Sequence, residues 1–248
     1  GYRHDNIAGH EVVLVGEDGG KKVRVRPYED SLSYSVESVD VVLYDDGSAH
    51  CKGMRYLSLD QVEPYVGFAD FSEKAKFNAV MGANSLNPVD FKIDSVEDNF
   101  DDWVDMDDGE EYVPHMQIGY SFGAYDYAKV SGDRIFLNLN PFAKQMHADR
   151  KPRVNDFVRT RSLVVRDEVS VLLPEGYSVE AMPSTSEIST QFGVLKTDVQ
   201  LVDAEGGKKM VVSQTLSLSP GRYSKDEYEV YKIFAKDVSK AYSARVVL

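Results

Sequence analysis

The sequence predicts a mainly β protein built as two β-sandwich-like domains, each with a short helix. Three observations lead to this prediction. Apolar and polar residues alternate with a period of two in many segments, which is typical of strands with one buried face. Gly- and Asp-rich turns separate these segments at the spacing of a sandwich. Helical signals are confined to two stretches, which begin near Ser72 and Ser224.

Composition and charge exclude several classes of protein. The 248 residues are 42% hydrophobic and 28% charged, which is ordinary for a folded soluble protein. The net charge of −13 argues against nucleic acid, because phosphate binding depends on clustered Lys and Arg. No apolar run approaches the roughly 20 residues that cross a bilayer. We therefore expect no nucleic-acid partner, no membrane insertion and no cofactor.

In the first half, tight turns join predicted strands. A hairpin is expected around residues 17–20, and a second one around the turn at residues 45–48. Apolar positions change from even to odd near Ser38, which predicts a bulge or a bend. Ser72 can cap a helix that runs to about Gly82. Further strands are expected at residues 89–96, 113–120, 125–130 and 134–139.

The boundary between the two domains is expected in the polar, Pro-punctuated stretch 140–156. We place it after residue 148, which gives a β-rich domain at 1–148 and a β-sandwich domain at 149–248. The second domain opens with alternating residues 163–173, where Asp167 is the one polar residue among the apolar odd positions. A turn at residues 174–176 then predicts a second strand over 177–181.

The remaining sequence of the second domain predicts another hairpin and a terminal helix. Two alternating segments flank the turn at residues 203–207. Ser224 and Glu227 have the spacing of a capping box, in which each side chain satisfies a backbone N–H near the helix start. Apolar residues follow at helical spacing and predict an amphipathic helix that packs on the sandwich. Residues 245–248 predict a short last strand or an extended tail.

Several segments of the chain occur in an order that matches a known family. They are GDRIFLNLNPF (132–142), FVRTRSLVV (157–165), LPEGYSVEAMP (173–183), QFGVLKTDV (191–199) and YSKDEYEVYKIFAKDVSKAYSARVVL (223–248). Their order resembles the C-terminal region of bacterial transglutaminase-like proteins, and residues 132–248 carry the resemblance best. Those proteins have an N-terminal β-rich domain, a transglutaminase-like core and a closing β-rich region whose last domain has no known function.

The resemblance implies that the catalytic core, with its Cys-His-Asp triad, lies upstream of this sequence. No residue here matches that triad, so no catalytic residue is expected. The sequence opens without a signal-peptide pattern and enters strand-like sequence almost at once, so we expect a fragment of a longer protein. The resemblance also implies a periplasmic, cell-surface or secreted location.

Cys51 is the only cysteine, which excludes an intrachain disulfide and a Cys-based zinc cluster. It lies in an alternating strand, where its neighbours His50 and Lys52 would point to the opposite face. A base must come within hydrogen-bond reach of a nucleophile. His115 and His147 are distant from Cys51 in sequence, so either could act as that base only if the fold brought it next to the thiol. A free cysteine behaves mainly as a small buried hydrophobe, so a core position is favoured.

Two other groups of residues are weak candidates for binding sites. Residues 94–111 are densely acidic, and Asp105, Asp107 and Asp108 could supply oxygens to Ca²⁺. The glycine falls one position too early for an EF-hand, so a solvated loop is favoured. Four tyrosines could form a sugar-stacking platform, although strand packing is favoured because strands prefer aromatic residues. They are Tyr112, Tyr120, Tyr125 and Tyr127.

We expect a non-catalytic accessory module of a larger transglutaminase-like protein, which supports the core or mediates binding at the bacterial cell envelope. The expected partners are the upstream core of the same polypeptide and an envelope protein or glycan. One alternative is a carbohydrate-binding or adhesive β-sandwich, which exposed coplanar aromatic rings would favour. Another is a thiol enzyme built on Cys51, which an exposed sulfur beside a histidine would favour. A buried Cys51 would favour the accessory module.

Overall fold

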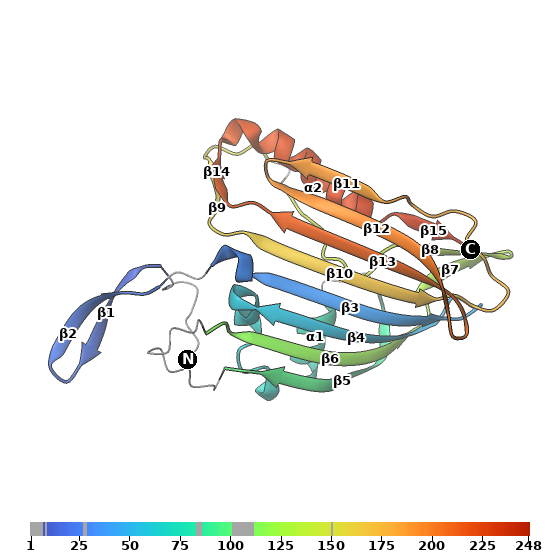
Figure 1. Ribbon diagram of the computed structural model, residues 1–248, viewed down its shortest axis with the longest axis horizontal. Coiled ribbons are helices and arrows are strands. Elements are labelled where there is room, and N and C mark those ends of the chain that lie inside the picture. The colour runs from blue at the N-terminus through green and yellow to red at the C-terminus, as the bar shows by residue number, and fades with distance from the viewer. Residues whose placement is uncertain (1–6, 8, 27–28, 83–85, 101–111, 150) are drawn as a thin grey trace.

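A long, curved sheet dominates the computed structural model, which describes residues 7, 9–26, 29–82, 86–100, 112–149 and 151–248 (Figure 1). The mainly β class expected from the sequence is confirmed. The strands are β1 (Glu11–Gly16), β2 (Gly19–Arg24), β3 (Tyr34–Leu43), β4 (Ala49–Ser58), β5 (Pro88–Asp98), β6 (His115–Ala124), β7 (Ala128–Ser131), β8 (Arg134–Asn138), β9 (Phe157–Arg159), β10 (Leu163–Leu172), β11 (Ser186–Thr190), β12 (Gly193–Ala204), β13 (Gly207–Leu218), β14 (Gly221–Tyr223) and β15 (Arg245–Val247). The helices are α1 (Glu73–Met81) and α2 (Tyr228–Tyr242), with 3-10 turns η1 (Asp30–Leu32), η2 (Leu59–Tyr65), η3 (Phe68–Asp70) and η5 (Lys225–Glu227).

The main sheet has eight strands in the order β11-β12-β13-β10-β3-β4-β6-β5. All neighbours are antiparallel except β3 and β10, which pair in parallel. The strands on one side of this parallel pair come from the first half of the chain, and those on the other side come from the second half. The expected division after residue 148 therefore separates two groups of strands that share one sheet. Whether each group of strands forms a separate domain stays a prediction.

A second layer covers the inner face of the main sheet. The three-stranded sheet β15-β8-β7 contributes Ile135, Leu137 and Val246 to the core that also contains Val169 and Val171 of β10. This sheet-on-sheet contact is the sandwich-like packing expected from the sequence. The apolar stripe of helix α2 packs on a second cluster of buried residues, in the region of β11 to β13 (Figure 1). None of the helices in the described ranges has the length and apolar run that a membrane crossing needs.

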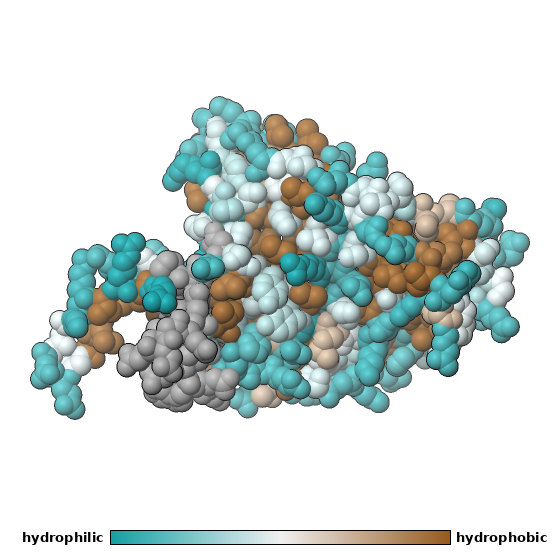
Figure 2. Space-filling view, viewed as in Figure 1, coloured by the Kyte–Doolittle hydropathy of each residue, from teal (hydrophilic) through white to brown (hydrophobic). Residues whose placement is uncertain are grey.

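The predicted helix starts and hairpins are confirmed. The Ser72 hydroxyl accepts a hydrogen bond from the Ala75 N–H at 3.3 Å and caps α1. Ser224 and Glu227 form the expected capping box, in which the Glu227 carboxylate accepts from the Ser224 N–H at 2.7 Å. The β1–β2 hairpin also forms, and it projects away from the body with Val13, Leu14 and Val15 exposed (Figures 1 and 2).

The bulge expected near Ser38 is wrong. Strand β3 keeps an unbroken register with β4 on one side and β10 on the other. The buried face runs through the odd positions from Glu37 to Leu43, so the apparent change of phase is a buried glutamate in an apolar row. Alternation of polarity alone does not distinguish a bulge from a buried charge.

The second strand expected over residues 177–181 is also wrong. After β10 the chain makes only one isolated bridge there, between Ala181 and Val247. Strand β10 already has β13 on one edge and β3 on the other, so no edge is left for a returning strand. The segment runs instead to β15, where the Glu180 N–H donates to the Val247 carbonyl at 2.8 Å.

A row of polar side chains crosses the buried face of the main sheet. Successive strand registers align Thr197, Gln214, Asp167, Glu37 and Arg55. The first four are at most 6% exposed, and the Arg55 side chain is 16% exposed. Burial of such groups is costly unless each one is hydrogen-bonded. We call these five residues the polar row.

Hydrogen bonds satisfy the polar row from both of its ends. The Asn140 amide donates to the Asp167 carboxylate at 2.9 Å and to the Gln214 carbonyl oxygen at 3.0 Å. At the other end, Arg55 Nε donates to Glu37 at 2.5 Å, and the Tyr120 hydroxyl donates to the second oxygen of Glu37. The rest of the Arg55 guanidinium donates to carbonyls in the last turn of α1. The row thus connects both halves of the sheet and α1.

Asp167 is a deeply buried carboxyl group in this row. The pKa of its carboxyl is raised from 3.8 to about 7, chiefly by burial and secondly by the charge of Glu37. The hydrogen bond from Asn140 and the charge of Arg55 act in the opposite direction. Because the folded pKa lies above the unfolded value, the folded state is favoured with Asp167 protonated.

We predict that this carboxyl makes the protein less stable as the pH rises. Its contribution is fully present below the unfolded pKa of 3.8 and is lost as the pH rises through about 7. At about 1.4 kcal/mol per pKa unit the loss is roughly 4 kcal/mol. Asp167→Asn should flatten the dependence of unfolding free energy on pH between 4 and 8, measured by urea denaturation. The exposed neighbour variant Glu168→Gln should keep the wild-type slope. An equal slope in Asp167→Asn and wild type would contradict this assignment.

We also predict that the buried and exposed ion pairs differ in their contribution to stability. Arg55→Met leaves Glu37 as an unpaired buried charge and should lower the unfolding free energy by about 3–5 kcal/mol. Lys209→Met breaks the exposed ion pair between Lys209 and Asp40, in which the nitrogen and oxygen are 2.9 Å apart. This variant should change the unfolding free energy by less than about 1 kcal/mol. Equal losses in the two variants, measured by urea denaturation, would show that burial does not govern the cost.

Candidate functional site: an arginine-aromatic groove

The structure places Cys51 in the core. Its side chain is 0% exposed, between Val41 of β3 and Phe122 of β6 in the sheet register. Burial raises the pKa of the thiol from 9.0 to about 12. His50 is exposed, and His115 stacks on a tyrosine with the ring centroids 5.8 Å apart. Because the thiolate is the nucleophilic form, this cysteine is poorly suited to covalent catalysis.

The four candidate tyrosines do not share an exposed face. Tyr112, Tyr120 and Tyr127 are at most 4% exposed, whereas Tyr125 is 77% exposed. The Tyr112 hydroxyl donates to the Asn99 carbonyl at 2.7 Å, and the Tyr120 hydroxyl bonds to Glu37. The Tyr127 hydroxyl is buried without a hydrogen-bond partner in the described part of the chain. The structure therefore does not bring these residues together as a sugar-stacking platform.

The calcium candidates Asp105, Asp107 and Asp108 lie outside the described residues. Phe100, at the described end of the acidic segment, packs against the core. Within the described ranges, no group of three or more His, Cys, Asp or Glu side chains is placed to hold a metal ion. The calcium site stays a prediction.

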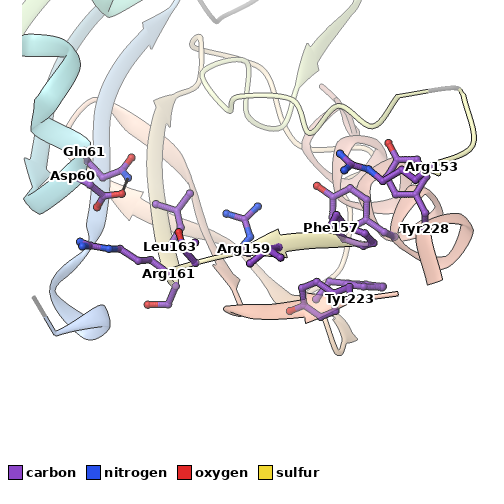
Figure 3. A pocket seen from close by; sticks show the side chains of 14 residues that line it. Asp60, Gln61, Arg153, Phe157, Arg159, Arg161, Leu163, Tyr223 and Tyr228 are labelled. Carbon is purple, nitrogen blue, oxygen red and sulfur yellow. Dashed lines mark hydrogen bonds between the residues drawn. The ribbon is translucent and has the colours of Figure 1, made fainter. Parts of the chain in front are cut away.

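A groove of about 430 Å³ lies where the beginnings of β9 and β10 approach η2 (Figure 3). Asp60 and Gln61 of η2 border one end, and Arg153 and Tyr228 border the other, with Arg159 between them. The remaining lining residues are Phe157, Val158, Thr160, Arg161, Ser162, Leu163, Phe192, Tyr223 and Tyr231. We call this feature the arginine-aromatic groove.

Aromatic rings build one wall of the groove around Phe157. Its ring centroid lies 5.2 Å from that of Tyr223, 5.6 Å from Tyr228 and 5.3 Å from Tyr231. The pairing of β9 with β14 places Phe157 opposite Tyr223. Tyr228 and Tyr231 are three residues apart in α2 and so share one helix face. The capping box fixes where this helix begins, and so it positions both rings.

Three arginines give the groove a positive charge. The Arg153 guanidinium lies over the rings of Phe157 and Tyr228, at 5.3 and 5.1 Å from their centroids. Arg159 is half-buried, and its guanidinium makes no hydrogen bond or ion pair with another described residue. Asp60 is the one carboxylate in the lining, and it accepts hydrogen bonds from Ser33 at 2.5 Å and Gln61 at 3.2 Å.

The side chains that line the groove are better suited to ligand binding than to catalysis. Guanidinium groups hold carboxylates and phosphates through paired hydrogen bonds, and aromatic rings add apolar contact. Among the described lining residues there is neither a cysteine nor a histidine. Sequence reasoning missed this groove. The sequence feature that could have indicated the groove is the cluster of Arg153, Arg159 and Arg161, which is unusual in a chain of net charge −13.

Comparisons with known proteins bear mainly on the second half of the chain. Residues 133–248 match the family described as a domain of unknown function with solved structure, DUF3858. Among solved structures, one match is a protein from Parabacteroides distasonis described as a "putative protease". It is 15% identical, with a TM-score of 0.33 over 88% of this chain and 40% of that protein's chain. No curated protein sequence matches the chain.

We predict that the Cys51 thiol is protected from reagents in the folded protein. Ellman's reagent should modify it more than about 100-fold more slowly in native buffer than in 6 M guanidinium chloride, because reaction needs an exposed thiolate. A matched control is Tyr125→Cys in a Cys51→Ala background, which carries one thiol at a position that is 77% exposed in the parent protein. Equal native rates for the two thiols would contradict the buried assignment.

Proposed function

We propose that this chain is a non-catalytic β-rich module of a larger transglutaminase-like protein, and that it uses the arginine-aromatic groove to bind a partner at the bacterial cell envelope or to position the core. The observation that carries the proposal is the chemistry of the groove, which joins three guanidinium groups to an aromatic wall. Such a set recognises a partner, since Arg and Tyr contribute strongly to binding interfaces.

Two further observations support a role without catalysis. A nucleophile needs a base within hydrogen-bond reach. Cys51 is fully buried, with a pKa raised to about 12, and so it does not serve this purpose. The segments that resemble transglutaminase-like proteins also fall in the region that follows the catalytic core in that family. Residues 133–248 of the same region match a domain of unknown function.

We predict that this chain alone does not incorporate a fluorescent amine into a glutamine-containing protein. The longer polypeptide read from the same frame should do so, because the upstream core would supply the cysteine. In that longer protein, Cys51→Ala should keep the rate of amine incorporation within about twofold, whereas replacing the triad cysteine of the upstream core should abolish it. Measurement is by fluorescence of the acceptor protein.

Two results would contradict the proposal. One is amine incorporation by this chain alone that disappears in Cys51→Ala, which would make it a thiol enzyme. The other is the finding that the longer natural polypeptide contains no such upstream cysteine and does not incorporate the amine, which would show that this chain does not belong to a transglutaminase-like protein. In both experiments circular dichroism must show that the variants remain folded.

A further inference from the structure

One wall of the groove is an extended main chain. Residues 157–163 line it without a gap. Side chains of an extended chain alternate between opposite faces, so a single face would supply only every second residue. An unbroken run indicates that the edge of the chain borders the groove. Strand β9, at the start of this run, pairs only with β14 among the described strands. Within the described part of the chain, no strand pairs with its other edge.

The charge along this wall favours carboxylates. Arg159 follows Phe157 on β9, and Arg161 lies two residues further along. The half-buried Arg159 guanidinium has lost part of its hydration without gaining an anionic partner in the described part of the chain. A ligand carboxylate would restore this lost interaction through a paired hydrogen bond. The rest of the molecule is strongly acidic, so an acidic ligand would be repelled elsewhere.

The aromatic wall favours a peptide over a sugar. Sugar recognition by stacking needs an open ring face, but Tyr228 is only 3% exposed and Tyr223 only 9% exposed. Their rings are packed against Phe157 and Phe192, and the Arg153 guanidinium covers the ring of Tyr228. Short apolar surfaces of this kind suit the alternating side chains of an added strand.

We propose that the arginine-aromatic groove binds an extended acidic peptide segment, which adds to the free edge of β9 and places carboxylates against Arg159 and Arg161. The main chain of the peptide would supply hydrogen bonds to β9, and its alternating carboxylates would supply specificity. This inference rests on the proposed binding role of the groove and names the chemical class of its partner.

The test uses a fluorescein-labelled hexapeptide of alternating Glu and Val, and two peptides matched to it. One has Gln in place of Glu, and the other has N-methyl groups on alternate amides. Fluorescence anisotropy with the whole chain should show saturable binding of the Glu peptide. The Gln peptide should bind at least about tenfold more weakly because it lacks the charge. The N-methylated peptide should lose a similar factor because it cannot pair along one edge.

Variants of the protein locate the site. Arg159→Gln should weaken binding of the Glu peptide at least about tenfold, and Arg159→Lys should have an intermediate effect because it keeps charge without the planar fork. Arg166→Gln is the matched control, since Arg166 is exposed and lies outside the groove. It should change the affinity by less than about twofold, as expected for a screened surface charge. Thermal unfolding should show that all variants remain folded.

Several outcomes would overturn the proposal. They are no binding of the Glu peptide, equal binding of the Glu and Gln peptides, equal binding of the N-methylated peptide, and equal losses in Arg159→Gln and Arg166→Gln. Binding of a sulfated glycan such as heparin with no binding of the Glu peptide would assign the groove to a different ligand class. These results are independent of the amine-incorporation assay, so failure here leaves the proposed non-catalytic role to be judged by that assay.

Discussion

The parallel pairing of β3 with β10 is the constraint on which the rest of the structure depends. It joins strands from the two halves of the chain into one sheet, and it places Glu37 beside Asp167 on the buried face. Two carboxylates in that position are tolerated only because Arg55 and Tyr120 bind one of them, while Asn140 binds the other. The same pairing occupies the last free edge of β10, which explains why the chain after it leaves the main sheet.

The groove is a consequence of this seam. Where β3 and β10 begin, the Val164 N–H donates to the Ser33 carbonyl at 3.2 Å, and the Ser33 hydroxyl donates to Asp60 at 2.5 Å. These two bonds bring η2, from the first half of the chain, against the approach to β10 from the second half. The aromatic wall is then added by β14 and α2. The arginine-aromatic groove is therefore lined by residues from both halves of the chain.

Local sequence chemistry predicted the parts of this fold that are themselves local. Alternation located most strands, turn residues located the hairpins, and Ser72 and Ser224 located the helix starts. Partners distant in sequence were not predictable in the same way. Asp167 was visible as a polar exception, but nothing near it in sequence indicates Glu37. Glu37 itself was hidden, because a charge in an apolar row and a shifted register give the same pattern.

The same limit applies to the candidate sites. Burial of Cys51 followed from its place in an alternating strand. Tyr120 is packed within β6, in line with the strand preference of aromatic residues, whereas the buried Tyr112 and Tyr127 lie outside the strands. The groove was missed because it joins segments that are far apart in the chain. The cluster of arginines was visible in the sequence, yet its aromatic wall depends on the pairing of β9 with β14, which no local pattern specifies.

The polar row explains how one register is selected at the seam. Val39 and Val41 face Val169 and Val171 across the parallel pair, and a slip of two residues toward Leu173 would keep both valines against apolar neighbours. The apolar contacts alone would therefore specify the register weakly. The same slip would place Glu37 opposite Val169 instead of Asp167 and so break the polar row into two parts that no longer meet. Buried polar groups favour the alignment that keeps them together, so the row contributes to the choice of register at the seam.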